Sequence, residues 1–374
     1  MAKVGTPKGT RDFPPEVVAR REYLFNTLKK HFRRYGFAPL ETPAMENLSV
    51  LTGKYGEEGD RLIFKILNSG DYLAKLSPEE RQNLDSGEMT PKISEKALRY
   101  DLTVPFARFV SQYHGTLTFP FKRYQIQSVW RAERPQKGRY REFTQCDCDV
   151  VGDDSLLSEV ELLQIYEDAF KDLGLTDVEL QVNNRKILAA YAEVLGAPEK
   201  LTDLTIAIDK LDKVGVGRVK EELSNKGFND DALTQLTPLF ELIESDTSNE
   251  GVLQILEGFI GETEIGEKGL QEMREFLSLA QSVNLKTLNI DPLLARGLDY
   301  YTGTIVEVKF EAGGGPSESG RGISCVMTGG GSSRPATGTS ATRRSSGHGP
   351  RQSRRTAVSV HLFGAAHRAA ERQS

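Results

Sequence analysis

Two strand-like runs on either side of a short basic loop constrain the fold of this chain more than any other feature. The runs are FKRYQIQSVWRAE, from Phe121, and YREFTQCDCDVVG, from Tyr140, and the loop between them is RPQKGR. The runs contain the β-branched and aromatic residues typical of strands, whereas the loop contains Pro and Gly. This pattern predicts a long antiparallel hairpin.

The second run has two chemically different faces, because side chains alternate along a strand. One face carries an aromatic ring, an amide and two acids: Phe143, Gln145, Asp147 and Asp149. The other face is small and apolar enough for a core: Thr144, Cys146, Cys148 and Val150. The two cysteines are interpreted as core thiols rather than zinc ligands, because only His114 lies within easy reach in the sequence. A hairpin whose polar face is solvated is a competing interpretation.

The loop concentrates positive charge next to these acids. Five cations lie within eleven residues: Arg131, Arg134, Lys137, Arg139 and Arg141. Guanidinium groups match the geometry of phosphate oxygens, and an aromatic ring offers a surface on which a flat base can stack. A ligand with phosphates at one end and an ammonium group at the other would satisfy every group. An amino acid that is being joined to ATP is such a ligand.

The rest of the chain alternates between helical and strand-like patterns as far as residue 312. An amphipathic helix is predicted over residues 14–36, and a second helix over 153–174. The run KALRYDLTVPFARFV reads as a strand that leads into a helix near Pro105. Residues 186–289 have helical periodicity with no convincing strand, and strand-like sequence returns at ARGLDYYTGTIVEVKF.

Composition indicates a globular protein without a membrane segment. The 374 residues carry a formal net charge of -5, with 38% hydrophobic and 27% charged residues. No run approaches the roughly 18 consecutive apolar residues of a membrane helix, and the N-terminus lacks an apolar signal-peptide core. Three cysteines cannot form a disulfide framework. We therefore expect a cytoplasmic location and no membrane partner.

Residues 313–374 differ in composition from everything before them. They contain nine Arg but two Glu, and more than a third of them are Gly or Ser. Only seven are Ile, Leu, Val, Met or Phe, too few to offset the entropy of ordering the segment. We expect this tail to be disordered. Translation in a wrong reading frame, or a cloning scar, is the favoured explanation, and nucleic-acid binding by a basic tail is the alternative.

The hairpin resembles motif 2 of the class II aminoacyl-tRNA synthetases, in which Arg-x-Glu precedes the loop and Phe follows it. The segments PKGTRDF and RGLDYYTG are similar to signatures of the histidyl-tRNA synthetase family. The resemblance covers about residues 5–312. It implies an α+β fold, in which an antiparallel sheet flanked by helices forms a class II catalytic domain that carries a helical insertion.

The resemblance also implies roles for individual residues. Four residues would bind ATP: Arg131 at the α-phosphate and amino acid carboxylate, Glu133 near the adenine amino group and the metal-bound phosphates, Arg139 near the γ-phosphate, and Phe143 stacked on adenine. Five would bind histidine: Asp101, Thr103 and Gln145 at the α-amino group, and Asp149 and Tyr301 at the imidazole. Arg131 and Arg296 would be catalytic, with Arg296 stabilising the reacting α-phosphate. Many members have Glu where this chain has Asp101. Pro43 matches a proline at the dimer interface.

The implied function is that of a histidine–tRNA ligase. Such an enzyme joins L-histidine to ATP, with Mg²⁺ at the phosphates and no metal held by the protein alone, and transfers it to tRNA(His) as a homodimer. The implied domains are a first catalytic part over 1–185, a helical insertion over 186–289, a return to the catalytic domain over 290–312, and the aberrant tail over 313–374. The tail stands where the family has motif 3 and an anticodon-binding domain, so we expect impaired activity.

Two other functions remain open at this point. The first is a synthetase-like regulatory subunit of ATP phosphoribosyltransferase, which shares the catalytic-domain fold and lacks the anticodon-binding domain. The full loop RPQKGRYREF, the intact RGLDYY and the helical insertion argue against it. The second is a nucleic-acid-binding protein that acts through its basic tail, for which a steep salt dependence of binding would be diagnostic.

Overall fold

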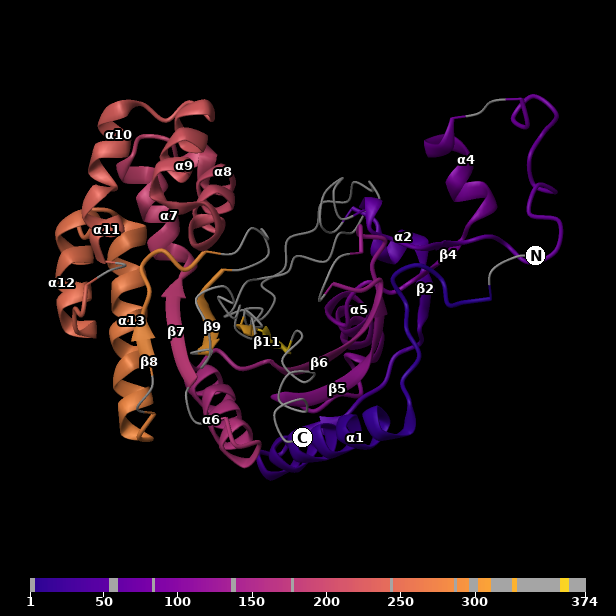
Figure 1. Ribbon diagram of the computed structural model, residues 1–374, viewed down its shortest axis with the longest axis horizontal. Helices are drawn as coiled ribbons and strands as arrows, with labels where there is room; N and C mark the ends of the chain where they lie inside the picture. Colours follow the sequence, from indigo (N-terminus) through magenta and orange to yellow (C-terminus); the bar gives the residue numbers. More distant parts are fainter. Residues whose placement is uncertain are drawn as a thin grey trace, which may run out of the picture.

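The computed structural model describes ten stretches of the chain (Figure 1): residues 4–53, 60–82, 85–135, 139–175, 178–242, 245–285, 288–295, 302–310, 325–327 and 357–362. For Asp212, Phe310 and the last two stretches, only the backbone is described. Helices and antiparallel strands occur together, which confirms an α+β fold. The proposed division into domains stays a prediction.

The predicted hairpin forms the centre of the largest sheet. It consists of β5 (Phe121–Trp130) and β6 (Glu142–Val151), which pair antiparallel from Phe121 opposite Val151 to Trp130 opposite Glu142. The sheet has the order β1-β5-β6-β11-β10, and β1 (Ala38–Pro39) runs parallel to β5. The FAPLETP region, residues 37–43, therefore supplies a short edge strand.

The tail contributes two strands to this sheet, contrary to our expectation of disorder throughout residues 313–374. They are β11 (Ala357–Leu362), which pairs antiparallel with β6, and β10 (Cys325–Met327), which pairs with β11. The physical reason is visible in AVSVHL, where Val358, Val360 and Leu362 recur at every second position. Averaging the composition over the whole tail concealed this strand period. The rest of the tail lies outside the described residues.

Two smaller sheets flank the largest one. One has the order β2-β4-β3, with β2 (Met45–Asn47), β3 (Lys65–Ile66) and β4 (Lys96–Leu98) all paired antiparallel. The other has the order β8-β7-β9 and contains β7 (Val178–Asn184), β8 (Leu288–Ile290) and β9 (Thr304–Phe310). The strand β9 follows the helical run in the sequence and pairs antiparallel with β7, which precedes that run.

The described residues around the first two sheets form the helices α1 (Pro15–Arg34), α2 (Leu48–Leu51), α4 (Ser86–Ile93), α5 (Thr103–Tyr113) and α6 (Leu157–Asp172). The helix α1 corresponds to the amphipathic helix expected over residues 14–36, and it contacts α6. Pro105 lies inside the first turn of α5, as expected, where its missing N–H costs nothing.

The long helical run forms a separate group beside the third sheet, drawn in pink to orange in Figure 1. It comprises α7 (Arg185–Val194), η1 (Pro198–Lys200), α8 (Leu201–Ile208), α9 (Leu211–Asn225), α10 (Asp230–Gln235), α11 (Thr237–Glu241), α12 (Asn249–Ile260) and α13 (Glu264–Ser282). One hydrophobic core runs from α1 and β6 through α6 into these helices. In the described part of the chain, no helix is long and apolar enough to cross a membrane.

Candidate active site

The polar face of β6 is buried, not solvated. Three cross-strand pairs line it: Arg123 with Asp149, Gln125 with Asp147, and Gln127 with Gln145. All of these side chains except Gln127 are at most 1% exposed. The solvated-hairpin interpretation is therefore wrong. On the opposite face Cys146, Cys148 and Val150 belong to the hydrophobic core, as the alternation predicted.

Asp149 forms an ion pair with Arg123 inside this face. The Arg123 Nε lies 2.6 Å from Asp149 Oδ2, and both side chains are 0% exposed. The guanidinium group also donates to Gln125 Oε1 at 3.0 Å and lies 4.1 Å from the ring centroid of Phe106. Burying either charge alone would be costly, and the opposite charge beside each one offsets that cost.

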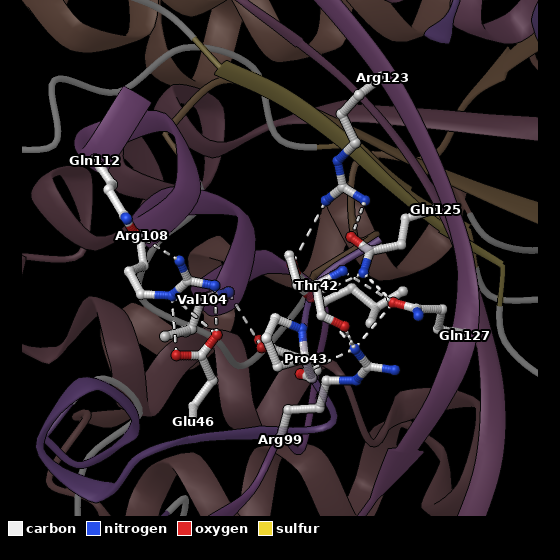
Figure 2. Close-up of polar contacts among 12 residues, drawn as sticks. Thr42, Pro43, Glu46, Arg99, Val104, Arg108, Gln112, Arg123, Gln125 and Gln127 are labelled. Carbon is white, nitrogen blue, oxygen red and sulfur yellow. Dashed lines mark hydrogen bonds and ion pairs between the residues drawn. The ribbon is translucent and has the colours of Figure 1, made fainter. Parts of the chain in front are cut away.

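A row of hydrogen bonds continues from Arg123 to the turn at Pro43 (Figure 2). Gln125 donates to Gln127 Oε1 at 2.5 Å, and Arg99 donates to the same oxygen at 2.9 Å. Arg99 also donates to the carbonyl of Pro43 at 3.1 Å. Burial lowers the pKa of Arg99, and Glu41 and Glu46 oppose that shift. The guanidinium remains charged at neutral pH, so the row carries a positive charge at each end.

The ATP-binding candidates gather at the loop end of the hairpin. Arg131 donates from Nε to the carbonyl of Tyr100 at 3.0 Å, and its guanidinium carbon lies 5.2 Å from the ring centroid of Phe143. Arg139 and Glu133 form an ion pair with an Nε–Oε2 distance of 3.3 Å. Two guanidinium groups, a carboxylate and an aromatic ring therefore lie at one end of the sheet. Such groups are suited to binding a nucleoside triphosphate.

The turn before α5 brings the first two histidine candidates to the same face. Asp101 is 5% exposed and accepts from the backbone N–H of Val104 at 3.1 Å, and Thr103 begins the helix. The neighbouring carbonyl of Leu102 accepts from Arg123 Nη2 at 3.5 Å. Since Arg123 also pairs with Asp149 on β6, the structure places this turn beside that strand, which carries Gln145 and Asp149.

Arg296 and Tyr301 lie outside the described residues, but both ends of their segment are anchored on β7 and α7. Asn183 donates to the carbonyls of Pro292 and Leu294, each at 3.0 Å. Beyond the segment, the N–H of Arg185 donates to the carbonyl of Gly303 at 2.8 Å. The residues on either side of the segment are therefore held by hydrogen bonds to the buried Asn183 side chain and to the backbone of Arg185.

The sequence patterns did not predict the four side chains of the polar row. They are Arg99, Arg123, Gln125 and Gln127. A signal existed for three of them, because Arg123, Gln125 and Gln127 alternate along β5 just as the acids alternate along β6.

Comparisons with known proteins agree with this geometry. The model of the family described as histidyl-tRNA synthetase matches residues 90–345, so the similarity continues past residue 312. A histidine–tRNA ligase of Christiangramia forsetii is 54% identical over 309 residues, which are 82% of this chain and 67% of the relative. A histidine–tRNA ligase of Bacteroides fragilis is 52% identical over the same shares.

Solved structures show the same architecture. The crystal structure of histidyl-tRNA synthetase from Nostoc sp. PCC 7120 has a TM-score of 0.74 and 26% identity, covering 98% of this chain and 74% of that one. A protein described as an ATP phosphoribosyltransferase regulatory subunit/histidyl-tRNA synthetase, from Bacillus halodurans, has a TM-score of 0.73 and 18% identity, which shows the fold alone.

The fold and the site together define a class II aminoacyl-tRNA synthetase, an enzyme that activates an amino acid with ATP. The chain belongs to the histidyl-tRNA synthetase family. Neither the regulatory subunit nor the basic-tail nucleic-acid binder is favoured, since relatives that match 82% of the chain are histidine–tRNA ligases.

Proposed function

We propose that this chain is a histidine–tRNA ligase, which activates L-histidine with ATP and transfers it to tRNA(His). One observation carries the proposal: the buried ionic face of β5 and β6 ends in a loop that gathers Arg131, Glu133 and Arg139. The 54% identity to a histidine–tRNA ligase over 309 residues supports the same proposal.

The loop end serves the nucleotide. Arg131 binds the α-phosphate together with the histidine carboxylate, and Arg139 binds the γ-phosphate. Phe143 stacks on adenine, and the Arg131 guanidinium carbon lies 5.2 Å from the centroid of the same ring. The Glu133 carboxylate is the kind of oxygen ligand with which Mg²⁺ joins substrate phosphates, and this ion would neutralise charge on those phosphates.

The interior of the same face serves histidine. Asp101, Thr103 and Gln145 bind the α-amino group, and Asp149 and Tyr301 bind the imidazole. Asp149, whose Oδ2 lies 2.6 Å from Arg123 Nε, offers its carboxyl oxygens to an imidazole N–H. A pocket built from polar groups rejects apolar amino acids by about 10⁴–10⁵, because those groups would be left unpaired.

The reaction needs no covalent bond to the protein. A carboxylate oxygen of histidine attacks the α-phosphorus of ATP, a new P–O bond forms, and the bond to pyrophosphate breaks. Negative charge develops on the phosphoryl oxygens, where Arg131 and Arg296 stabilise it. The protein contributes position and charge. In the proposed homodimer the turn at Pro43, whose carbonyl accepts from Arg99, lies at the subunit interface. We place the enzyme in the cytoplasm, where tRNA is charged.

Histidine-dependent ATP–pyrophosphate exchange by the purified chain tests the proposal. The readout is the ratio of the exchange rate with histidine to the rate with each other amino acid. A slow rate caused by the unusual tail leaves that ratio unchanged. Equal responses to histidine, leucine and glutamine from a folded protein would rule out the histidine pocket.

A variant of Arg296 tests the catalytic assignment. Arg296→Ala should lower the exchange rate by about 10² or more, by analogy with the loss of one oriented oxyanion donor. It should change histidine affinity little, because charge on the α-phosphate peaks in the transition state. Arg20→Ala, at an exposed position of α1, is the matched control. An unchanged rate for Arg296→Ala would remove this residue from the catalytic set.

A further inference from the structure

The N-terminal segment, residues 7–13, packs on the loop end of the hairpin although more than 120 residues separate the two. The backbone N–H of Arg141 donates to the carbonyl of Gly9 at 2.8 Å, and Arg141 Nη1 lies 3.5 Å from the carbonyl of Lys8. The segment is itself a tight turn, in which the N–H and hydroxyl of Thr10 both donate to the carbonyl of Pro7, at 3.0 and 2.8 Å.

Gly9 makes this close approach possible. Its φ is +88°, a conformation that side chains disfavour. A Cβ built there would lie 2.8 Å from Pro135 Cγ and 2.9 Å from Arg141 Cγ, nearer than real contacts allow. Both atoms belong to the loop side of the hairpin, so glycine is required for the segment to lie flat against that loop.

Arg11 forms a second attachment. Its guanidinium carbon lies 3.9 Å from the ring centroid of Tyr140 and 4.9 Å from that of Phe13. Arg21 of α1 also contacts Phe13, with its guanidinium carbon 4.3 Å from the ring centroid. Arg21 Nη2 donates to Thr144 Oγ1 on β6 at 2.8 Å. Cation–π contacts and one hydrogen bond therefore connect α1, the N-terminal segment and the start of β6.

Arg141 links the N-terminal segment to the ATP-binding candidates through hydrogen bonds. The carbonyl of Arg141 accepts from the N–H of Arg131 at 2.9 Å, and its Nε donates to the carbonyl of Glu133 at 3.0 Å. Glu133 in turn pairs with Arg139. Arg141 is therefore bonded on one side to the N-terminal segment and on the other to the backbone that carries the phosphate-binding groups.

We propose that residues 7–13 are a positioning element for the phosphate-binding loop, with Gly9 and Arg11 as the residues that hold it. The segment supplies no group to the reaction. It fixes the backbone of Arg131, Glu133 and Arg141 before ATP arrives, which lowers the entropy cost of binding the triphosphate in a reactive pose. This inference rests on the proposed function for its ligand, and on the contacts above for its geometry.

Hydrogen exchange in the full-length chain tests the geometry without reference to activity. Gly9→Ala and Arg11→Gln should each raise amide exchange in peptides that cover residues 131–141, by about tenfold, because local opening there becomes easier. Gly36→Ala is the matched control, since Gly36 also has a positive φ, +80°, but its Cβ would meet nothing within 4 Å. Peptides from α12 should be unaffected in every variant.

ATP–pyrophosphate exchange then separates positioning from mere stability. Gly9→Ala and Arg11→Gln should raise KM for ATP by about tenfold or more and KM for histidine by clearly less, because ATP relies on Arg131, Glu133 and Arg139, whereas histidine shares only Arg131 with the misplaced loop. Arg11→Lys should lie in between, because lysine keeps the charge but not the planar stack.

Three results would overturn the proposal: unchanged exchange at 131–141 in both variants, an equal rise in Gly36→Ala, or a looser loop with an unaltered KM for ATP. If Gly9→Ala fails to fold, Arg11→Gln, which introduces no clash, carries the same measurements. Failure of the unaltered chain to show any histidine-dependent reaction would count against the proposed function instead. Hydrogen exchange would still decide whether the segment holds the loop.

Discussion

The polar face of β5 and β6 and the helical group α7–α13 carry their charges in opposite ways. Arg123 and Asp149 are both 0% exposed and pair at 2.6 Å. In the helical group, the side chains of Arg218 and Glu221 are 74% and 62% exposed, and those of Lys268 and Glu264 are 59% and 84% exposed. The sheet buries this ion pair completely, whereas the side chains in the described ion pairs of the helical group are between 24% and 84% exposed.

This difference separates charge kept for function from charge kept for solubility. A buried ion pair loses its hydration, and an apolar pair of similar volume is often as stable or more so. An exposed pair loses little hydration and gains little. The energetics of the pair therefore do not by themselves explain why both charges are buried, which agrees with the proposed role of Asp149 in binding histidine.

The largest expected effect comes from removing one partner of the buried pair. Arg123→Met should lower the free energy of unfolding by about 3–5 kcal/mol, because Asp149 would lose the cation that offsets its burial. Urea denaturation of the purified chain measures it. Arg218→Met, in the exposed pair of α9, is the control and should change it by less than about 1 kcal/mol.

The double variant sharpens the comparison. Arg123→Met combined with Asp149→Leu should recover most of the lost stability, since neither charge is then buried alone. It should also abolish selective histidine binding in calorimetric titration. Equal losses for Arg123→Met and Arg218→Met would show that burial does not distinguish the two regions.

The next effect concerns a buried carboxyl group on α6, next to the helical group. Burial raises the pKa of Glu159 to about 7, and the like charges of Asp153 and Glu272 add to the shift, whereas the backbone and Lys186 oppose it. Within the described residues, Glu159 Oε2 has no hydrogen-bond partner. Asp149 is equally buried but has a cation at 2.6 Å. Two buried acids thus differ by the presence of a close cation.

The raised pKa of Glu159 predicts a loss of stability as pH rises. Between pH 4.5 and 7 the folded state holds a proton that the unfolded state has released, so the free energy of unfolding falls across this window. The fall is on the order of 3 kcal/mol for a shift of this size. Glu159→Gln should flatten the unfolding free energy between about pH 5 and 8. An identical slope for variant and parent would contradict the assignment.

A smaller effect is expected at Arg99, at the far end of the polar row. Arg99→Met removes hydrogen bonds to the carbonyls of Pro43 and Ser128 and to Gln127. It should cost about 2 kcal/mol, because those buried acceptors lose a charged donor. Arg33→Met, on the outside of α1, is the control. Thermal unfolding at equal protein concentration measures both variants. A loss no larger than that of the control would show that the hydrogen bonds of Arg99 do not stabilise the fold.

Local periodicity predicted much of the fold. The alternation of β6 placed Cys146 and Cys148 in the core and Asp149 on the polar face. The helical period was confirmed by α7–α13 as far as Ser282, but the expectation of no strand within residues 186–289 was wrong at its end, where β8 (Leu288–Ile290) begins. Both signals belong to one element at a time. The resemblance to a known family supplied the site residues, of which Arg296 and Tyr301 lie outside the described part of the chain.

Long-range pairing was not predictable in the same way. Nothing within β6 indicates that β11 lies on its outer side, with Val360 opposite Cys148, because a strand does not specify its partner. An unpaired edge of β6 would expose its backbone polar groups, and a short alternating segment such as Ala357–Leu362 can satisfy them. The burial of Asp149 could not be predicted from β6 alone either, because the cation beside it, Arg123, belongs to β5.

The smallest expected effect tests the other half of the comparison. Lys268 and Glu264 lie four residues apart on α13, with Nζ and Oε1 at 2.6 Å. Lys268→Gln should change the free energy of unfolding by less than about 0.5 kcal/mol, because water already solvates both groups. Any loss should vanish at about 1 M NaCl, where the screening length is about 3 Å. Glu267→Gln, on the same helix, is the control. A loss as large as that expected for Arg99→Met, if it survived salt, would mean that the helical group depends on its ion pairs as the sheet does, and the contrast between the two regions would fail.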